Sequence, residues 1–132
     1  MKRVYPIILI PAEMGYVVYV PDLKINTEGI DIPNAIEMAR DAIGLWGITE
    51  EDCGRDIPEP MTIEIEKIEH NSDEIVTLVD VDFKEYRKAN DIRTIRKNVT
   101  IPSWLNYAAE KEGINFSQVL QEALKERLQL QK

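Results

Sequence analysis

The residues best suited to do chemistry lie in the short run RTIRKNVTI, residues 93–101. If this run is a β-strand, its side chains alternate between two faces. Arg96, Asn98 and Thr100 then share one polar face. In the major groove of DNA, Arg pairs with guanine, Asn pairs with adenine, and Thr contacts either kind of base edge. The run therefore predicts a surface that reads double-stranded DNA.

The opposite face of the same run is mainly apolar. Ile95, Val99 and Ile101 lie on it, and Lys97 interrupts it with a charge whose role the sequence does not explain. Pro102 follows immediately. Proline has no N–H for a sheet ladder but fits the first turn of a helix, so the strand is expected to end there and a helix to begin.

Two helices are predicted after the strand. The first spans about 103–112, carries Leu105 at helical spacing and ends near Gly113. The second opens with the run Asn115-Phe-Ser-Gln118, which has the form of a capping box. Backbone N–H groups near Asn115 and Ser117 could hold a DNA phosphate beside the groove. The second helix presents a broad apolar face that includes Val119 and Leu120.

A strand and two helices in some forty residues are too small to bury their apolar faces alone. Two copies solve this problem by pairing their strands into an antiparallel ribbon that packs on four helices. The predicted dimer contacts are Val99, Ile101, Leu105, Val119 and Leu120. The predicted DNA contacts are Arg96, Asn98, Thr100, Asn115 and Ser117.

Charge separates this C-terminal part from the rest of the chain. Residues 1–90 hold nine Lys and Arg and nineteen Asp and Glu, a net charge of −10, whereas residues 91–132 hold seven and five, a net charge of +2. The acidic part repels nucleic acid and attracts a basic protein, while the C-terminal part can approach phosphates. The alternative is that the acidity only keeps the protein in solution.

The N-terminal part is predicted to be an antiparallel sheet with one packed helix, so the chain as a whole is α+β. Asp31 is the candidate cap of that helix and Gly47 its expected end. The predicted strands are 4–10, 15–20, 24–28, 61–66 and 75–81, and the helix is 33–46. A short helix is expected from Asp82, followed by linker. The expected division is an acidic domain at 1–82, a linker at 83–92 and the C-terminal domain at 93–132.

Several short motifs of the sequence are typical of one protein family. Residues 93–130 resemble a ribbon-helix-helix DNA-binding domain, and NVTIP, the Ala108-Ala109 pair and INFSQVLQEAL are similar to the version at the C-terminus of HicB-type antitoxins. YPII, the pattern E-x-G-Y-x-V-x-V-P-D-L and the later IPEP are similar to the partial RNase H-like domain of HicB. One departure is the run Lys24-Ile25-Asn26, which stands where family members commonly have Pro-Gly and a small residue.

The resemblance implies an antitoxin of a type II HicAB-like toxin-antitoxin system. Such a protein binds and neutralises a small basic HicA-type toxin that cleaves mRNA, and it represses its own operon by binding operator DNA. The resemblance also implies a homodimer or a tetramer formed as a dimer of dimers. The alternative is a free-standing ribbon-helix-helix transcriptional regulator whose N-terminal domain binds a small ligand or another protein.

No catalytic residue, metal site or cofactor is expected. RNase H enzymes carry a metal-binding carboxylate in the first strand, whereas residues 4–10 contain no acid. A third reading, an active hydrolase, predicts Mg²⁺-dependent RNA cleavage, and we expect none. Cys53 is the only cysteine, so no internal disulfide can form. The sequence also has no apolar run long enough to cross a bilayer. A cytoplasmic protein is the resulting expectation.

Overall fold

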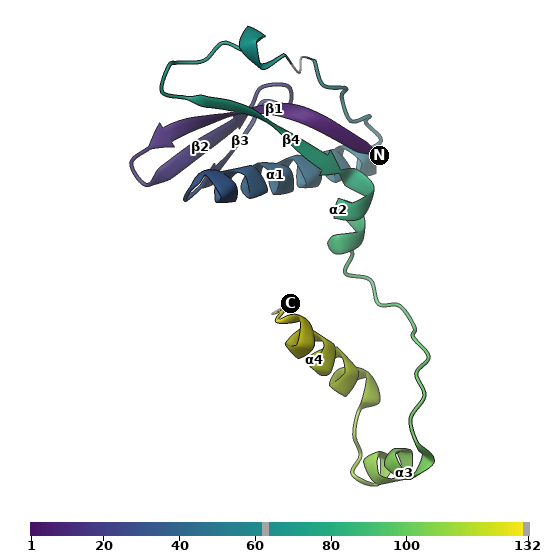
Figure 1. The fold of residues 1–132 in the computed structure, drawn as a ribbon. Coiled ribbons are helices and arrows are strands. Elements are labelled where there is room, and N and C mark those ends of the chain that lie inside the picture. Colours follow the sequence, from purple (N-terminus) through teal and green to yellow (C-terminus); the bar gives the residue numbers. More distant parts are fainter. Residues whose placement is uncertain (62–63, 131–132) are drawn as a thin grey trace. The chain divides into compact units, whose positions relative to one another are not determined.

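The computed structural model describes residues 1–61 and 64–130 (Figure 1). The chain divides into two units, Met1–Ile92 and Arg93–Lys132. The first unit contains β1 (Lys2–Ala12), β2 (Gly15–Val20), β3 (Ile25–Gly29), α1 (Ile32–Asp52), the 3₁₀ helix η1 (Ile65–Lys67), β4 (Ile75–Asp82) and α2 (Phe83–Ala89). The second unit contains α3 (Ser103–Lys111) and α4 (Phe116–Leu128).

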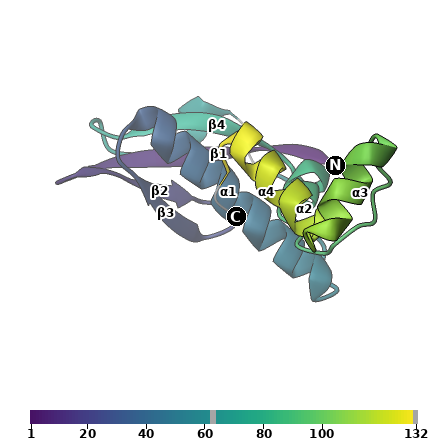
Figure 2. The same ribbon diagram turned by 90° about the horizontal axis from the view of Figure 1, so that it is seen from below.

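The sheet of the first unit is antiparallel throughout, with strand order β3-β2-β1-β4. The predicted hairpin is confirmed, with Ile8 opposite Tyr19 and Ala12 opposite Gly15. Helix α1 covers one face, and the segment carrying η1 passes over the other (Figures 1 and 2). This two-sided cover explains why β1 is a continuous apolar run. Along β1, Tyr5 belongs to the core between the sheet and α1, while its neighbour Pro6 is buried on the other face of the sheet.

The IPEP segment is held against the first strand. Ile57 is 5% exposed and belongs to the core. The Tyr5 hydroxyl donates to the carbonyl of Pro58 at 2.6 Å, and the Arg3 guanidinium contacts both the Ile57 carbonyl and the Glu59 carboxylate. Burial raises the pKa of Tyr5. A tyrosine phenol is protonated at neutral pH even without this shift, so the hydroxyl donates to Pro58 and anchors this segment.

Helix α1 begins as predicted but ends later. The Asp31 carboxylate accepts a hydrogen bond from the Asn34 N–H at 2.8 Å. The prediction that Gly47 ends the helix is wrong, because α1 continues to Asp52. A Cβ atom at Gly47 would overlap the ring of Phe83 in α2. This glycine is therefore a packing position, and its missing side chain makes room for a second helix.

The predicted strand at 61–66 is also wrong where the structure describes it. Residues 62 and 63 lie outside the described residues, and Ile65–Lys67 form a 3₁₀ helix. Ile65 and Ile68 are both half-buried. A spacing of three places both side chains on the same side of a 3₁₀ turn, which has three residues per turn. The alternation of Ile63 and Ile65 along the sequence indicated the period of two of a strand, whereas Ile65 and Ile68 follow the period of three of a 3₁₀ helix.

The short helix predicted from Asp82 is present as α2 and packs on α1. The Asp82 carboxylate caps it by accepting hydrogen bonds from the N–H groups of Lys84 and Glu85. Phe83 is 2% exposed and belongs to the core. The Tyr86 hydroxyl donates to Asp41 at 3.1 Å. Consequently α2 is an integral part of the first unit rather than free chain.

In the second unit, both predicted helices are present. The backbone of Pro102 begins α3, and Gly113 follows it with φ +70°. The Asn115 side chain caps α4 by accepting from the Gln118 N–H at 3.1 Å. The capping residues read from the sequence therefore mark the starts of both long helices, α1 and α4.

Replacing Gly47 by valine is expected to destabilise the first unit by about 2 kcal/mol, because the new side chain overlaps Phe83 and forces the helices apart. Urea unfolding measures the free energy of unfolding. The control is Leu45→Val at a half-exposed position of the same helix. Equal stability of the two variants would contradict the packing role of Gly47.

Hydrogen bonds from α2 lower the pKa of Asp82, that of the Glu85 N–H most of all. A carboxylate with a lowered pKa stabilises the fold above its ordinary pKa near 3.9, and this contribution is lost as pH falls through the lowered value. Asp82→Asn keeps the cap but does not titrate. Its free energy of unfolding should therefore fall less steeply than that of the wild type as the pH drops below about 4. Asp73→Asn, in a loop, is the control and should follow the wild type.

Candidate functional site

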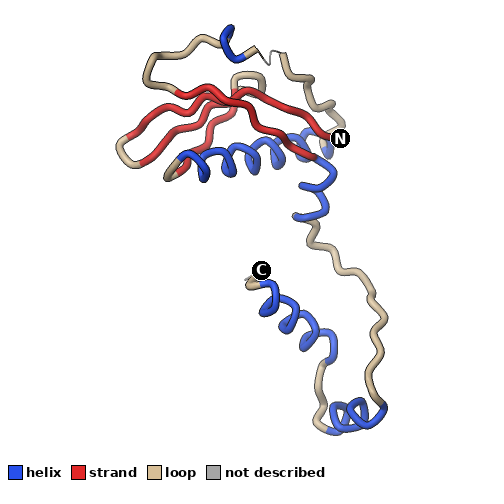
Figure 3. Tube along the Cα trace, in the orientation of Figure 1, coloured by secondary structure: helices blue, strands red, loops and turns tan. Residues whose placement is uncertain are grey.

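The predicted DNA-reading run lies at the start of the second unit. In the single chain, residues 93–101 form no strand, and all of them are exposed (Figure 3). The predicted ladder joins two chains, so the ribbon stays a prediction. Arg96, Asn98 and Thr100 accordingly lie in solvent-exposed chain that precedes α3.

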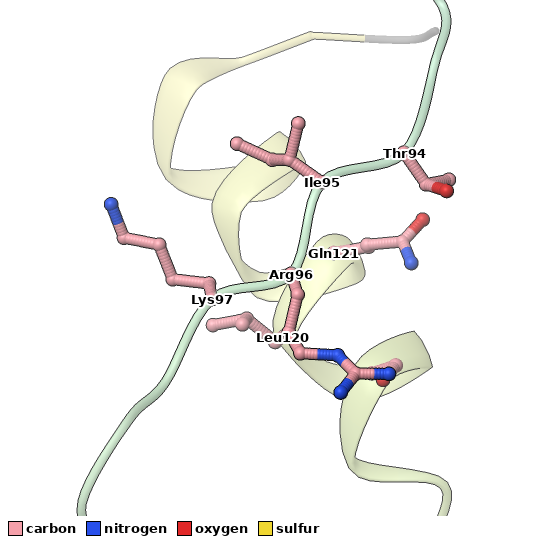
Figure 4. Close-up of a pocket in the computed structure, with 7 residues that line it drawn as sticks. Thr94, Ile95, Arg96, Lys97, Leu120 and Gln121 are labelled. Atoms are coloured by element: carbon pink, nitrogen blue, oxygen red, sulfur yellow. The ribbon is translucent and has the colours of Figure 1, made fainter.

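A pocket of about 570 Å³ joins this run to α4. Its lining residues are Thr94, Ile95, Arg96, Lys97, Ser117, Leu120 and Gln121. Figure 4 shows Thr94 and Arg96 on one side of the run and Ile95 and Lys97 on the other. Alternate side chains thus already point in opposite directions. Arg96 and Ser117, two of the predicted DNA contacts, come together here, whereas Asn98 and Thr100 do not line the pocket.

The chemistry of the pocket suits an anion. Arg96 and Lys97 supply positive charge, and the hydroxyls of Thr94 and Ser117 can donate hydrogen bonds. The amide of Gln121 adds a further donor. The strand period places Thr94 on the same polar face as Arg96, although it was not among the predicted DNA contacts. Gln121 was missed, and its spacing could have found it, because it follows Ser117 by about one helical turn.

Asn115, a predicted DNA contact, also has a structural role as the N-cap of α4. Its side-chain oxygen accepts the Gln118 N–H and so completes the N-terminus of α4. The neighbouring backbone N–H groups carry the positive end of the helix dipole. Asn115 therefore builds the helix end on which Ser117 sits.

The residues predicted to form the dimer are solvent-accessible in the single chain. Val99 is 62% exposed and Val119 50%, while Leu120 is half-buried. No residue among 93–130 is buried. Large apolar side chains are instead exposed along the whole unit: Ile95, Val99, Ile101, Trp104, Leu105, Tyr107, Ile114, Phe116, Val119, Leu124, Leu128 and Leu130. An apolar surface this extensive is typical of interaction sites in proteins.

The first unit carries the negative charge, and its cations are largely engaged. Arg40 binds the carbonyl and carboxylate of Asp80, which lowers the pKa of that carboxyl. Arg87 pairs with Glu51 and Asp52 at 3.3 and 3.0 Å. Further pairs involve Lys2, Arg3, Arg55, Lys67 and Lys88. The remaining carboxylates therefore dominate the surface of this unit.

Within the described parts of the chain, no group of three His, Cys, Asp or Glu side chains could hold a metal ion. His70 lies in an exposed loop, where its Nδ1 is 2.8 Å from the Ile68 carbonyl oxygen. Cys53 is exposed beyond the end of α1. None of the described helices is both long and apolar enough to span a membrane.

Comparison with known proteins identifies relatives along most of the chain. The family model for the HicB-like antitoxin of bacterial toxin-antitoxin systems matches residues 5–123. A comparison with curated proteins gave no significant match.

Solved structures show the same fold. A toxin-antitoxin complex from Streptococcus pneumoniae matches with a TM-score of 0.57 and 24% identity, over 96% of this chain and 99% of that chain. The antitoxin HicB of Burkholderia pseudomallei matches with a TM-score of 0.54 and 25% identity, over 96% of this chain and 97% of that chain. The antitoxin HicB3 matches with a TM-score of 0.53 and 21% identity, over 94% of this chain and 96% of that chain. With a family model matched over most of its length, this chain belongs to the HicB-like antitoxin family of bacterial toxin-antitoxin systems.

Proposed function

We propose that this chain is the antitoxin of a type II toxin-antitoxin pair, with one task for each unit. The first unit binds and neutralises a small basic HicA-type toxin that cleaves mRNA in the cytoplasm. The second unit dimerises as a ribbon-helix-helix domain and represses the operon that encodes both proteins. The observation that carries this proposal is the second unit, which has no buried residue among 93–130 yet exposes twelve large apolar side chains.

Pairing two second units removes this exposed surface from water. Val99 and Ile101 would face the shared interior beside Leu105 and Val119. Each large aliphatic side chain that becomes fully buried stabilises the pair by roughly 1.5–3 kcal/mol relative to exposure. Several such residues in each copy are enough to offset the ordering of the 93–101 run. The ribbon then forms together with the dimer, and two dimers on neighbouring half-sites would give a tetramer.

The polar face of the ribbon would read operator DNA. Arg96, Asn98 and Thr100 of each copy would point into the major groove. The pocket that Arg96 and Ser117 share could hold a backbone phosphate beside the base contacts. The net charge of +2 over residues 91–132 permits this approach, whereas the acidic first unit would be kept away from the DNA.

Neutralisation of the toxin is assigned to the first unit on charge and family. A net charge of −10 over residues 1–90 attracts a basic protein. A structural relative of this chain comes from a toxin-antitoxin complex. The protein acts by binding rather than catalysis in this proposal, because β1 lacks the acid that RNase H chemistry needs and the described residues hold no metal-binding cluster.

Arg96→Ala should weaken binding to operator DNA about 5- to 150-fold, because losing a bidentate base contact costs roughly 1–3 kcal/mol. Fluorescence anisotropy with DNA from the protein's own promoter measures this affinity. Arg96→Lys is the matched control for charge, since it keeps the cation but loses the fork geometry. Toxin neutralisation should be unchanged. Its loss with DNA binding intact would contradict the division of tasks.

Val99→Asp should separate the C-terminal dimer, because it places a charge in the shared apolar interior. Sedimentation of the full chain reports the mass of the assembly. Thr100→Asp tests the adjacent residue on the opposite face and should leave the mass unchanged, although it should weaken DNA binding. An unchanged mass for Val99→Asp would count against pairing of the two runs.

A further inference from the structure

One end of the first unit carries a hollow that the proposed function does not yet use. Its lining residues come from the β1–β2 turn and the strand residues beside it, the end of β3 and the first turns of α1. Its volume is about 450 Å³. The side chains that matter to its chemistry are Met14, Val17, Glu28, Ile30, Asn34 and Met38.

The rim of this hollow is unusually apolar for an exposed surface. Met14 is 90% exposed and Ile30 is 77% exposed, and Val17 and Met38 are both more than a third exposed. A single exposed apolar side chain needs no explanation, but a group around one hollow indicates a contact surface. Methionine is flexible and polarisable, so Met14 and Met38 can adapt to the shape of an inserted side chain.

The backbone that presents Ile30 is firmly held. Its N–H donates to the Asn34 side-chain oxygen at 2.9 Å, and the Asn34 N–H donates to the Asp31 carboxylate at 2.8 Å. On the other wall, Gly15 has φ +109°, and a Cβ there would overlap the Gly29 carbonyl oxygen. The backbone around the hollow is thus formed in advance, and little backbone freedom remains to be lost when a partner binds.

The charges around the hollow are mainly negative. Glu28 lines it, and Glu13, Asp31 and Glu37 are each next in sequence to a lining residue, while the nearby Arg40 is paired with Asp80. Nucleic acid would be repelled by this rim. A second copy presenting the same end would place carboxylates against carboxylates. An apolar side chain flanked by lysine or arginine is the complementary chemistry.

We propose that this hollow is the surface through which the chain holds its toxin: a basic segment of the toxin inserts an apolar side chain between Met14, Ile30 and Met38, and flanking cations meet Glu28 and its acidic neighbours. This inference rests on the proposed function, because it identifies the partner as the basic toxin. It adds where the contact lies and what the toxin presents there.

The test uses the full chain and, as the probe, the purified basic toxin encoded beside it, in a catalytically inactive form. Ile30→Asp and Met14→Asp should each weaken toxin binding about 30-fold or more, as expected for central contacts of an interface. Both residues are highly exposed, so the variants should fold, which thermal unfolding checks. Leu45→Asp, at an exposed apolar position on α1, is the matched control and should bind within about twofold of the wild type.

Charge is tested separately. Glu28→Lys should slow association with the toxin, and the deficit should shrink as salt is added, because screening removes long-range attraction. Glu66→Lys in η1 is the control for the change in net charge.

The outcomes separate this inference from the proposed function. If the wild type does not bind the toxin, the proposed function is wrong. If the wild type binds but Ile30→Asp and Met14→Asp bind equally well, the function stands and the hollow is not the contact surface. If these variants instead change only the self-association of the chain, the hollow contacts a second copy and the inference is overturned.

Discussion

The burial of apolar side chains is the constraint on which the whole molecule depends, and the two units meet it in different ways. In the first unit, β1 lies between α1 and the segment carrying η1, so Tyr5, Ile7 and Leu9 are fully buried within one chain. In the second unit, α3 and α4 leave no residue among 93–130 buried. About forty residues cannot enclose a core of their own. The first unit therefore buries its core within the single chain, whereas the second unit leaves its apolar side chains exposed, which is why we propose that it pairs with a second copy.

This difference in burial accompanies a difference in charge. The first unit carries a large excess of carboxylates after its cations have been taken up in pairs such as Arg40 with Asp80. The second unit is mildly basic, and Arg96 and Lys97 lie beside the first turns of α4. These opposite charges agree with the proposed partners, a basic protein for the first unit and a nucleic acid for the second. In that proposal the two partners would not compete for one surface.

The packing of α2 against α1 requires two glycines of α1, which leave room for aromatic rings of α2. Gly44 and Gly47 open a shallow face on α1, into which the rings of Tyr86 and Phe83 fit. The Asp82 cap and the pairing of Arg87 with α1 then fix the helix direction. The chain consequently leaves the first unit from a rigid helix, and the run 93–101 begins only a few residues later.

Much of the local structure was predictable from the residues. The hairpin of β1 and β2, the Asp31 cap of α1, the Asn115 cap of α4 and the helix start after Pro102 all depend on short-range chemistry, and the structure confirms them. Gly47 was misread as a helix end, because a glycine that ends a helix and one that admits a neighbouring ring look alike in sequence. Ile65 was misread because strand and 3₁₀ periods cannot be distinguished over so few residues.

The sequence by itself indicated most of the elements and the separation of charge, since these follow from periodicity, capping and composition. Its motifs resembled those of the HicB family, and the family model matches residues 5–123. Only the tertiary structure decided which side chains stay exposed. It brought Arg96 to Ser117 and Met14 to Ile30 and Met38, residues that are far apart along the chain or in different elements. Contacts of this kind depend on how strands and helices pack, and no local pattern encodes that packing. The surfaces that we propose to bind partners are therefore a property of the fold, built from residues that look unremarkable in sequence.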